Sequence, residues 1–178
     1  MWSNIDYTET WSALEHAVNN GKVNSIGVSN FNPDQIERLL KCSHAPSVNQ
    51  VECHPYFSQK KLLEWCNEHD IIVTAYSPLS NPQRRMSESL QLNLLEDPVV
   101  KNIAAKHNKS AGQIVLRWGI QRGTVVIPKA SSEKHLKENF DILNFSLTED
   151  EMSSLEALNR GQRFVDLPQD AHHPHYPF

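Results

Sequence analysis

The chain has 178 residues, of which 39% are hydrophobic, and these values argue against disorder and suit one globular domain with a sizeable core. Its formal charge of −4, from 17 basic and 21 acidic residues, leaves no basic surplus for a phosphate backbone. We therefore expect no nucleic-acid partner. A small anionic ligand remains compatible with this charge.

Cysteine spacing and apolar runs predict the compartment. The three cysteines, Cys42, Cys53 and Cys66, have no C-x-x-C spacing, which is typical of reduced thiols in a cytosolic protein. No apolar run approaches the roughly 20 residues of a membrane span, and the first ten residues do not resemble a signal peptide. We expect a cytoplasmic chain without a membrane association.

Apolar side chains at helical spacing, in six cases after a capping residue, predict seven helices. They lie at 6–21, 32–40, 62–69, 97–104, 110–118, 132–140 and 148–158, and the third is predicted from its apolar residues alone. In the last of them, Thr148 and Glu151 form a capping box, and Met152, Leu155 and Leu158 form the expected buried stripe.

Short apolar runs between these helices predict four strands, near 25–29, 48–52, 71–75 and 124–127. The first three recur about every 23 residues, which is the length of one compact βα unit with its crossover. This alternation predicts an α/β fold with a parallel sheet in sequence order. The first run, Ile26 to Val28, indicates a strand that begins buried.

All four predicted strands end in polar residues, in "IGVSNFN", "SVNQVECHPY", "IIVTAYSPL" and "TVVIPKASS". Ligands gather at the carboxyl ends of parallel strands, because loops and helix N-termini converge there. For one strand, helix caps and turns explain such residues better, but four matching ends favour a site. We expect the Gln50 amide to be buried and to face this site, with Asn49 pointing away and bracing a neighbouring loop.

Two segments depart from this pattern. The long polar connection at 77–96 is typical of a functional loop, and the last stretch, 159–178, indicates an irregular tail lying across the fold. In that tail Pro174 interrupts His172, His173 and His175, and no carboxylate or thiol adjoins them. We therefore expect no metal site and interpret the tail as part of a substrate loop.

Six motifs in this order resemble the aldo-keto reductase family: "GVSNFN", "NQVECHPY", "AYSPL", "LLEDPVV", "VLRWGIQR" and "VVIPKASSEKHLKENFDIL". The resemblance runs from Tyr7 to Phe178. It implies half of a TIM (β/α)₈ barrel, with four parallel strands (family strands five to eight), outer helices and an open sheet. It also implies that residues 1–178 are one partial domain of an NAD(P)H-dependent enzyme that reduces aldehydes and ketones.

The resemblance carries over cofactor positions but no catalytic ones. It implies that Ser29, Asn30 and Gln50 bind the nicotinamide carboxamide and that Tyr76 stacks on its ring. The positions for the pyrophosphate are Ser77, Leu79 and Asn81, and those for the adenosine and its phosphate are Lys129, Ser132, His135, Glu138 and Asn139. There is no G-x-G-x-x-G motif, so a Rossmann site is not expected.

Four positions depart from the family pattern. Many relatives have arginine at His135 and serine at Ala130, both placed to hold the 2′-phosphate, so NADP(H) is expected but NAD(H) is possible. Gln83 stands where many relatives have an acidic residue that links the loop over the pyrophosphate to the lysine at the position of Lys129. Because glutamine cannot form this salt bridge, we expect faster cofactor release. Met86 stands where some members have a tryptophan of the substrate pocket.

The family's catalytic tyrosine, lysine, aspartate and histidine lie on the first four strands, and none of them maps onto this chain. Tyr7, Tyr56 and Tyr176 do not occupy the tyrosine position, and His54 is expected to be a hydrogen-bonded structural histidine. A carbonyl reductase needs a positioned acid to protonate the carbonyl oxygen as the hydride arrives.

Three hypotheses follow. The favoured one is a cofactor-cradling half of a reductase, which binds a nicotinamide dinucleotide weakly and accepts a small carbonyl substrate only if the missing half is supplied. The second is a non-catalytic interaction module, a half-barrel that self-associates through its open edges or joins a separate amino-terminal half. The third, and least favoured, is an enzyme with a new acid such as Tyr56.

Overall fold

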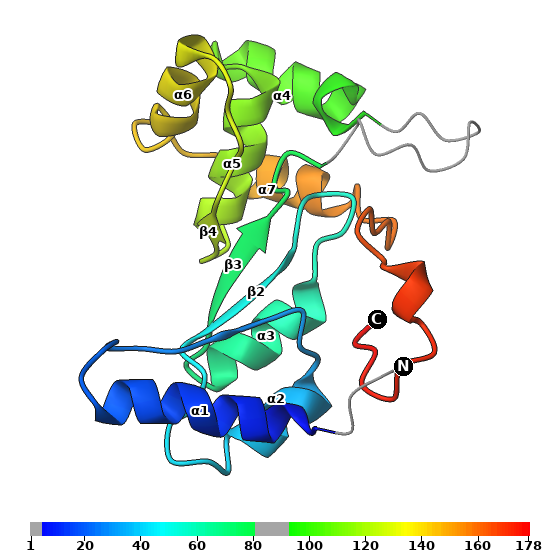
Figure 1. The fold of residues 1–178 in the computed structure, drawn as a ribbon. Coiled ribbons are helices and arrows are strands. Elements are labelled where there is room, and N and C mark those ends of the chain that lie inside the picture. The colour runs from blue at the N-terminus through cyan, green and yellow to red at the C-terminus, as the bar shows by residue number, and fades with distance from the viewer. Residues whose placement is uncertain (1–4, 81–92) are drawn as a thin grey trace. The chain divides into compact units, whose positions relative to one another are not determined.

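A computed structural model describes residues 5–80 and 93–178. Its helices, labelled in Figure 1, are α1 (Tyr7–Asn19), α2 (Pro33–Leu39), α3 (Lys60–Glu68), α4 (Pro98–His107), α5 (Ala111–Gln121), α6 (Glu133–Phe140) and α7 (Glu149–Glu156). Two 3₁₀ turns are η1 (Leu94–Glu96) and η2 (Pro168–Asp170). The strands are β1 (Val28–Ser29), β2 (Val48–Glu52), β3 (Ile72–Tyr76) and β4 (Val125–Val126). The predictions at Asn81, Gln83 and Met86 lie outside the described residues.

Every predicted helix is present, and the caps account for where the helices begin. Asn32, Ser110 and Thr148 each accept a hydrogen bond from the backbone N–H three residues later. The glutamine or glutamate at that third position returns a bond to the cap's own N–H, which completes a capping box. Asp6 caps α1 through Thr8 instead.

The four strands form one sheet in the order β1-β2-β3-β4, which confirms the parallel sheet predicted from the alternation. β1 pairs with β2 in parallel, with Val28 opposite Asn49, and β3 pairs with β4 in parallel, with Ala75 opposite Val126. The edge strands have two residues each, so the predicted spans 25–29 and 124–127 were too long. An edge strand has one neighbour only, and fewer of its backbone groups are held in a ladder.

The prediction that the first strand begins buried was wrong. Ile26 and Val28 are half-buried, and Gly27 and Ser29 are exposed. In β4, likewise, Val125 keeps 48% of its surface exposed. The inner strands do carry buried residues, among them Val51 and Val73. The apolar residues therefore predicted where the edge strands lie in the sequence, but not how far their side chains are buried.

Contacts divide the chain into two compact units, each with its own core. Unit 1 contains residues 1–51, 60–73 and 166–178, and unit 2 contains residues 52–59 and 74–165. The core of unit 1 includes Trp11, Ile36, Leu39, Leu63, Cys66 and Ile71. The core of unit 2 includes Leu94, Val100, Ile114, Leu116, Trp118 and Leu155. Within unit 2, α5 contacts α4, α6, β4 and η1, and so it lies at the centre of that unit.

Two helices bury less apolar surface than expected. In α7 only Leu155 of the predicted stripe is fully buried, while Met152 and Leu158 are half-buried. Another buried residue of α7 is Glu151, whose carboxylate pairs with His107 at 2.8 Å. Helix α6 has no fully buried residue, and Phe140 at its end is 85% exposed.

Among residues 5–80 and 93–178, no helix is both long enough and apolar enough to span a bilayer. All three cysteines are free thiols, as predicted, with Cys53 and Cys66 buried. Burial raises the pKa of both buried thiols to about 11, which keeps them protonated and unreactive near neutral pH.

We predict opposite effects for two glycine-to-alanine substitutions in α5. A Cβ at Gly119 would lie 2.7 Å from Cγ1 of Val126, so G119A should overpack the contact with β4 and destabilise the chain by about 1 kcal/mol net of the helix-propensity gain. A Cβ at Gly112 would come no closer than 3.8 Å to its nearest neighbour, so G112A should stabilise the chain by about 0.5 to 1 kcal/mol. Urea unfolding of both variants measures this, and equal signs would contradict it.

Candidate functional site

Three predicted site residues of unit 1 lie together where β1 ends beside the middle of β2. Ser29 Oγ donates to the Gln50 carbonyl at 2.9 Å, and the Asn30 backbone N–H donates to the same oxygen at 2.9 Å. Asn30 has a positive φ of 59°, a left-handed conformation that asparagine tolerates better than most residues. This backbone reversal at the strand end directs the chain from β1 into the loop before α2.

Asn49 of β2 has the role that the sequence predicts, whereas the burial of Gln50 differs from the prediction. Asn49 is fully buried, and its side chain bonds both backbone groups of Phe31, with Nδ2 donating at 2.8 Å and Oδ1 accepting at 3.4 Å. It therefore braces the loop between β1 and α2, as expected. Gln50 is only half-buried, so the expectation of a buried Gln50 amide was wrong, because the fully buried amide of this strand is Asn49.

The predicted residues that follow β3 lie in unit 2. Tyr76 is the last residue of β3 and is half-buried. Ser77 has a positive φ of 47°, and its carbonyl accepts from Ser80 N–H at 2.8 Å, which closes a turn that contains Leu79. A non-glycine residue in this conformation is strained, and such strain concentrates at functional sites. The backbone thus changes direction through a left-handed residue directly after both β1 and β3.

The five residues predicted for the adenosine end lie after β4, in the loop and in α6. Ser132 caps α6, accepting a bond from His135 N–H at 3.2 Å. Lys129, Ser132 and His135 are exposed, and Glu138 pairs with Lys134 at 3.8 Å. Asn139, four residues after His135 on α6, is half-buried and lies on the wall of an apolar pocket. Among these five residues, a hydrogen bond joins Ser132 with His135.

That apolar pocket has a volume of about 510 Å³ and lies between α5, β4 and α6. Its lining includes Ile120, Thr124, Val125, Val126, Pro128, Leu136, Phe140, Ile142 and Leu143. Leu136 is 58% exposed and Leu143 is 70% exposed, so the pocket opens onto an exposed apolar surface.

A buried hydrogen-bonded pair of side chains that the sequence prediction missed lies at the end of β2. Glu52 and His54 are both fully buried, with Nε2 of His54 3.0 Å from Oε1 of Glu52. Both Glu52 oxygens also accept backbone N–H bonds, from Phe164 at 2.7 Å and from Val165 at 2.8 Å. His54 is therefore a hydrogen-bonded structural histidine, as predicted.

These bonds determine the charge state of Glu52. Burial alone would raise its pKa, but the hydrogen bond with His54 and the two backbone N–H groups together hold the pKa below its usual value. The carboxylate is therefore ionised at neutral pH and fixes the chain at Phe164 and Val165. A glutamate inside the apolar run that ends β2 was the available signal, because an acid at such a position needs partners.

Tyr56 does not have the geometry of a catalytic acid. It is only 2% exposed, and its hydroxyl donates to Oδ2 of Asp97 at 2.7 Å. Burial, then the bond to Asp97, raise the pKa of Tyr56 to about 12. The guanidinium of Arg160 covers the ring at 4.5 Å. A carbonyl substrate could not reach this hydroxyl without breaking that packing, which argues against the hypothesis of a new acid.

The carboxyl-terminal segment is irregular apart from η2, as predicted, and each unit binds its own part of it. In unit 2 the Tyr56 carbonyl accepts N–H bonds from Arg160 and Gln162 at 3.1 and 3.0 Å. In unit 1 Gln35 donates its amide to the His175 carbonyl at 2.8 Å, and the His175 ring lies 5.1 Å from that of Tyr7. Within the described ranges, no group of three or more His, Cys, Asp or Glu could hold a metal ion.

These features define a parallel α/β sheet of the kind found in barrel enzymes, with polar and strained residues at its strand ends. The Aldo/keto reductase family model matches residues 2–160. The chain belongs to the aldo/keto reductase family.

Curated relatives support this assignment over the whole chain. It is 51% identical over 182 residues to Aldo-keto reductase family 1 member D1 of Oryctolagus cuniculus, covering 100% of this chain and 56% of the relative. It is 43% identical to Prostaglandin F synthase 2 of Bos taurus, with the same coverage of both chains. It is 41% identical to Aldo-keto reductase family 1 member A1-A of Danio rerio, covering 100% of this chain and 58% of the relative. The chain thus spans little more than half the length of these relatives.

We predict that Glu52→Gln removes part of the acid sensitivity of the fold. Because the folded pKa of Glu52 is lowered, its stabilisation is fully present above the ordinary glutamate pKa of 4.5 and is lost as the pH falls through the folded pKa. At pH 7, E52Q should lower the free energy of unfolding by about 2 kcal/mol, since a charged acceptor of buried N–H groups is lost.

Urea unfolding between pH 7 and pH 3 measures this, with E64Q at an exposed position of α3 as the matched control. The stability of E52Q should fall less than that of the wild type over this range. Parallel pH profiles for the wild type and E52Q would contradict the prediction.

Proposed function

We propose that the chain is the cofactor-cradling part of an NAD(P)H-dependent carbonyl reductase and does not turn over by itself. The observation that carries this proposal is the clustering of Ser29 and Asn30, at the end of β1, with Gln50 of the adjoining strand β2, in a chain of this family. We further propose that residues 1–178 are one domain, since β2 and β3 each run through both compact units. Free thiols fit a reducing compartment, and we assign the chain to the cytoplasm.

The nicotinamide end would be held by two kinds of contact. The side chains of Asn30 and Gln50 are half-buried and offer amide donors and acceptors for a carboxamide. Tyr76, half-buried at the end of β3, offers a ring face for stacking. Stacking would leave the other face of the nicotinamide open for hydride transfer, which is the chemistry that this cofactor supplies.

The phosphates would be held by the loops after β3 and β4. The turn that contains Ser77 and Leu79 is proposed for the pyrophosphate, and Asn81, outside the described residues, is proposed with them. Lys129 lies in the loop before α6 and Ser132 caps that helix, and an ammonium and free helix N–H groups suit a phosphate. His135, Glu138 and Asn139 complete the proposed set, and the histidine leaves NAD(H) possible beside NADP(H).

No catalytic residue is proposed within this chain. The only buried tyrosine hydroxyl near the strand ends of the described residues, that of Tyr56, is already donated to Asp97. Without general acid catalysis a reduction slows by roughly 10² to 10⁴. A small carbonyl substrate would react only when the missing part of a relative is added.

We predict weak NADPH binding without turnover. Fluorescence titration with NADPH should give weak saturable binding, weakened further in Y76A and about fivefold in K129A, since a phosphate–ammonium contact contributes about 1 kcal/mol. K61A, at an exposed position of α3, is the matched charge control. NADPH absorbance should stay constant with a reactive aromatic aldehyde, and should fall when the missing half of a related reductase is added as a separate polypeptide.

Two outcomes would contradict this proposal. Binding that is equal in the wild type, Y76A and K129A would remove the proposed cofactor site. Turnover by the chain alone that is lost in Y56F would establish Tyr56 as an acid.

A second candidate, a non-catalytic half-barrel that self-associates or joins a separate amino-terminal half, is favoured by the apolar pocket. Phe140, Leu143 and Leu136 expose 85%, 70% and 58% of their surfaces around it, and β4 beside it is an edge strand. Exposed apolar patches of this kind mark interaction sites, and unpaired strand edges invite pairing.

We predict that the F140S/L143S double variant reduces any self-association. If this surface joins two copies, light scattering of the wild type should show a mass that rises with concentration, and the double variant should remain monomeric. L14S, at an exposed position of α1, is the matched apolar control and should behave like the wild type. A wild type that stays a compact monomer at all concentrations would refute self-association, and only assembly with a separate amino-terminal half would then remain of the second candidate.

A further inference from the structure

One face of α5 carries a polar side chain at every fourth position. The series begins at the lysine just before the helix cap. These residues, which we call the polar ladder, are Lys109, Gln113, Arg117 and Gln121. Residues four apart lie on the same side of a helix, so the four side chains extend along one edge of α5. All four contact the segment 141–147, which connects α6 to α7.

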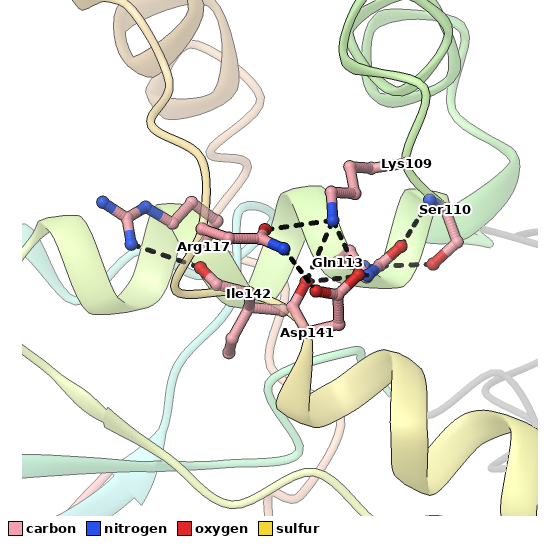
Figure 2. A network of polar contacts seen from close by, with 7 residues as sticks. Lys109, Ser110, Gln113, Arg117, Asp141 and Ile142 are labelled. Atoms are coloured by element: carbon pink, nitrogen blue, oxygen red, sulfur yellow. Dashed lines mark hydrogen bonds and ion pairs between the residues drawn. The ribbon is translucent and has the colours of Figure 1, made fainter.

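The polar ladder binds mainly backbone groups of this connection (Figure 2). Gln113 Nε2 donates to the Asp141 carbonyl at 2.8 Å, and Arg117 Nη1 donates to the Ile142 carbonyl at 3.2 Å. Gln121 bonds both backbone groups of Leu147, accepting from its N–H at 2.7 Å and donating to its carbonyl at 3.1 Å. The connection is therefore fixed through its main chain along its length.

Asp141 receives the densest set of contacts in the polar ladder. Its carboxylate accepts from Lys109 Nζ at 2.6 Å and from Gln113 Nε2 at 3.2 Å. Asn144 donates to its other oxygen at 2.5 Å. The Lys109 ammonium, chiefly through its hydrogen bond, lowers the pKa of Asp141, so this carboxylate is ionised at neutral pH. Figure 2 shows Lys109 and Gln113 converging on Asp141 from one side.

Asp141 is also the residue that ends α6. It immediately follows Phe140 and donates its N–H back to the Glu138 and Lys137 carbonyls as the helix cap. Because α6 has no fully buried side chain, packing fixes this helix weakly. The buried residue Ile142, next in the chain, and the polar ladder together fix the end of α6.

We propose that the polar ladder positions α6, so that Ser132 and His135 near its start are held where an adenosine phosphate binds. This inference rests on the proposed function, because it concerns the phosphate end of the same site. The polar ladder residues are positioning residues, since they touch the end of α6 and its connection and not the phosphate. Loss of the Asp141 contacts should let α6 move and should weaken the phosphate end selectively.

Gln113→Glu is the most selective test variant. Gln113 has two roles: its Oε1 accepts from Ser110 N–H at 2.9 Å in the capping box, and its Nε2 binds Asp141. Glutamate keeps the acceptor and the volume, and glutamate is also a normal partner in a capping box. It removes the donor and sets a second carboxylate beside Asp141, so it should break the polar ladder without removing the cap of α5.

Two measurements on the full chain determine the result. Hydrogen exchange of the amides of α6 should be about tenfold faster in Q113E than in the wild type, with the rates of α4 unchanged. Binding of 2′,5′-ADP, a probe of the adenosine phosphate end, should weaken about tenfold, while binding of reduced nicotinamide mononucleotide should stay unchanged. A general loss of structure would weaken both probes.

A rescue and a control complete the experiment. In Q113E/D141N the amide introduced at position 141 can donate to the carboxylate introduced at position 113, and the repulsion between two carboxylates is removed. Exchange of α6 and 2′,5′-ADP binding should therefore recover in this double variant. N102D, an amide-to-carboxylate change at an exposed position of α4, should match the wild type.

Three results would overturn the positioning role: unchanged α6 exchange in Q113E, equal weakening of both probes, or no recovery in the double variant. If the wild type binds neither probe, the proposed function fails, and the exchange rates alone still decide whether the polar ladder fixes α6.

Discussion

Parallel strand pairing is the constraint on which the rest of this structure depends. Parallel neighbours cannot be joined by a tight turn, so each strand leads into a crossover with a helix, and all strands end at one edge. At two of those ends the backbone reverses through a left-handed residue, Asn30 after β1 and Ser77 after β3. Local strain and polar side chains are therefore imposed at the same places where a ligand of such a sheet would bind.

Local sequence signals predicted the elements well because they act over three or four residues. Capping boxes fixed the starts of α2, α5 and α7, and proline at the first turn supported α2 and α4. The contact of the Asn49 side chain with the loop after β1 also agreed with the prediction. The lengths of β1 and β4 could not be predicted from the sequence. They depend on how many neighbouring strands each one has, and the apolar composition does not encode this number.

Contacts between distant residues were the part of the candidate site that the sequence did not predict. Glu52 binds His54, two residues away, but its other two partners, Phe164 and Val165, lie more than a hundred residues away, where no short window includes them. The polar ladder was equally hidden, since its four residues look like the solvated face of a helix. In both cases the signal was present but ambiguous: an acid inside an apolar run, and a polar period of four on α5.

The chain spans 56% of relatives such as the Oryctolagus cuniculus D1 protein, yet the contacts that fix its proposed cofactor elements are contained within it. Helix α6 and its connection are held by α5, and the segment near Phe164 is held by Glu52, all inside unit 2. The bonds of Ser29 and Asn30 to Gln50 are likewise made inside unit 1. The proposed binding positions can therefore be ordered locally, and the proposed reduction would in addition need a positioned proton donor for the carbonyl oxygen.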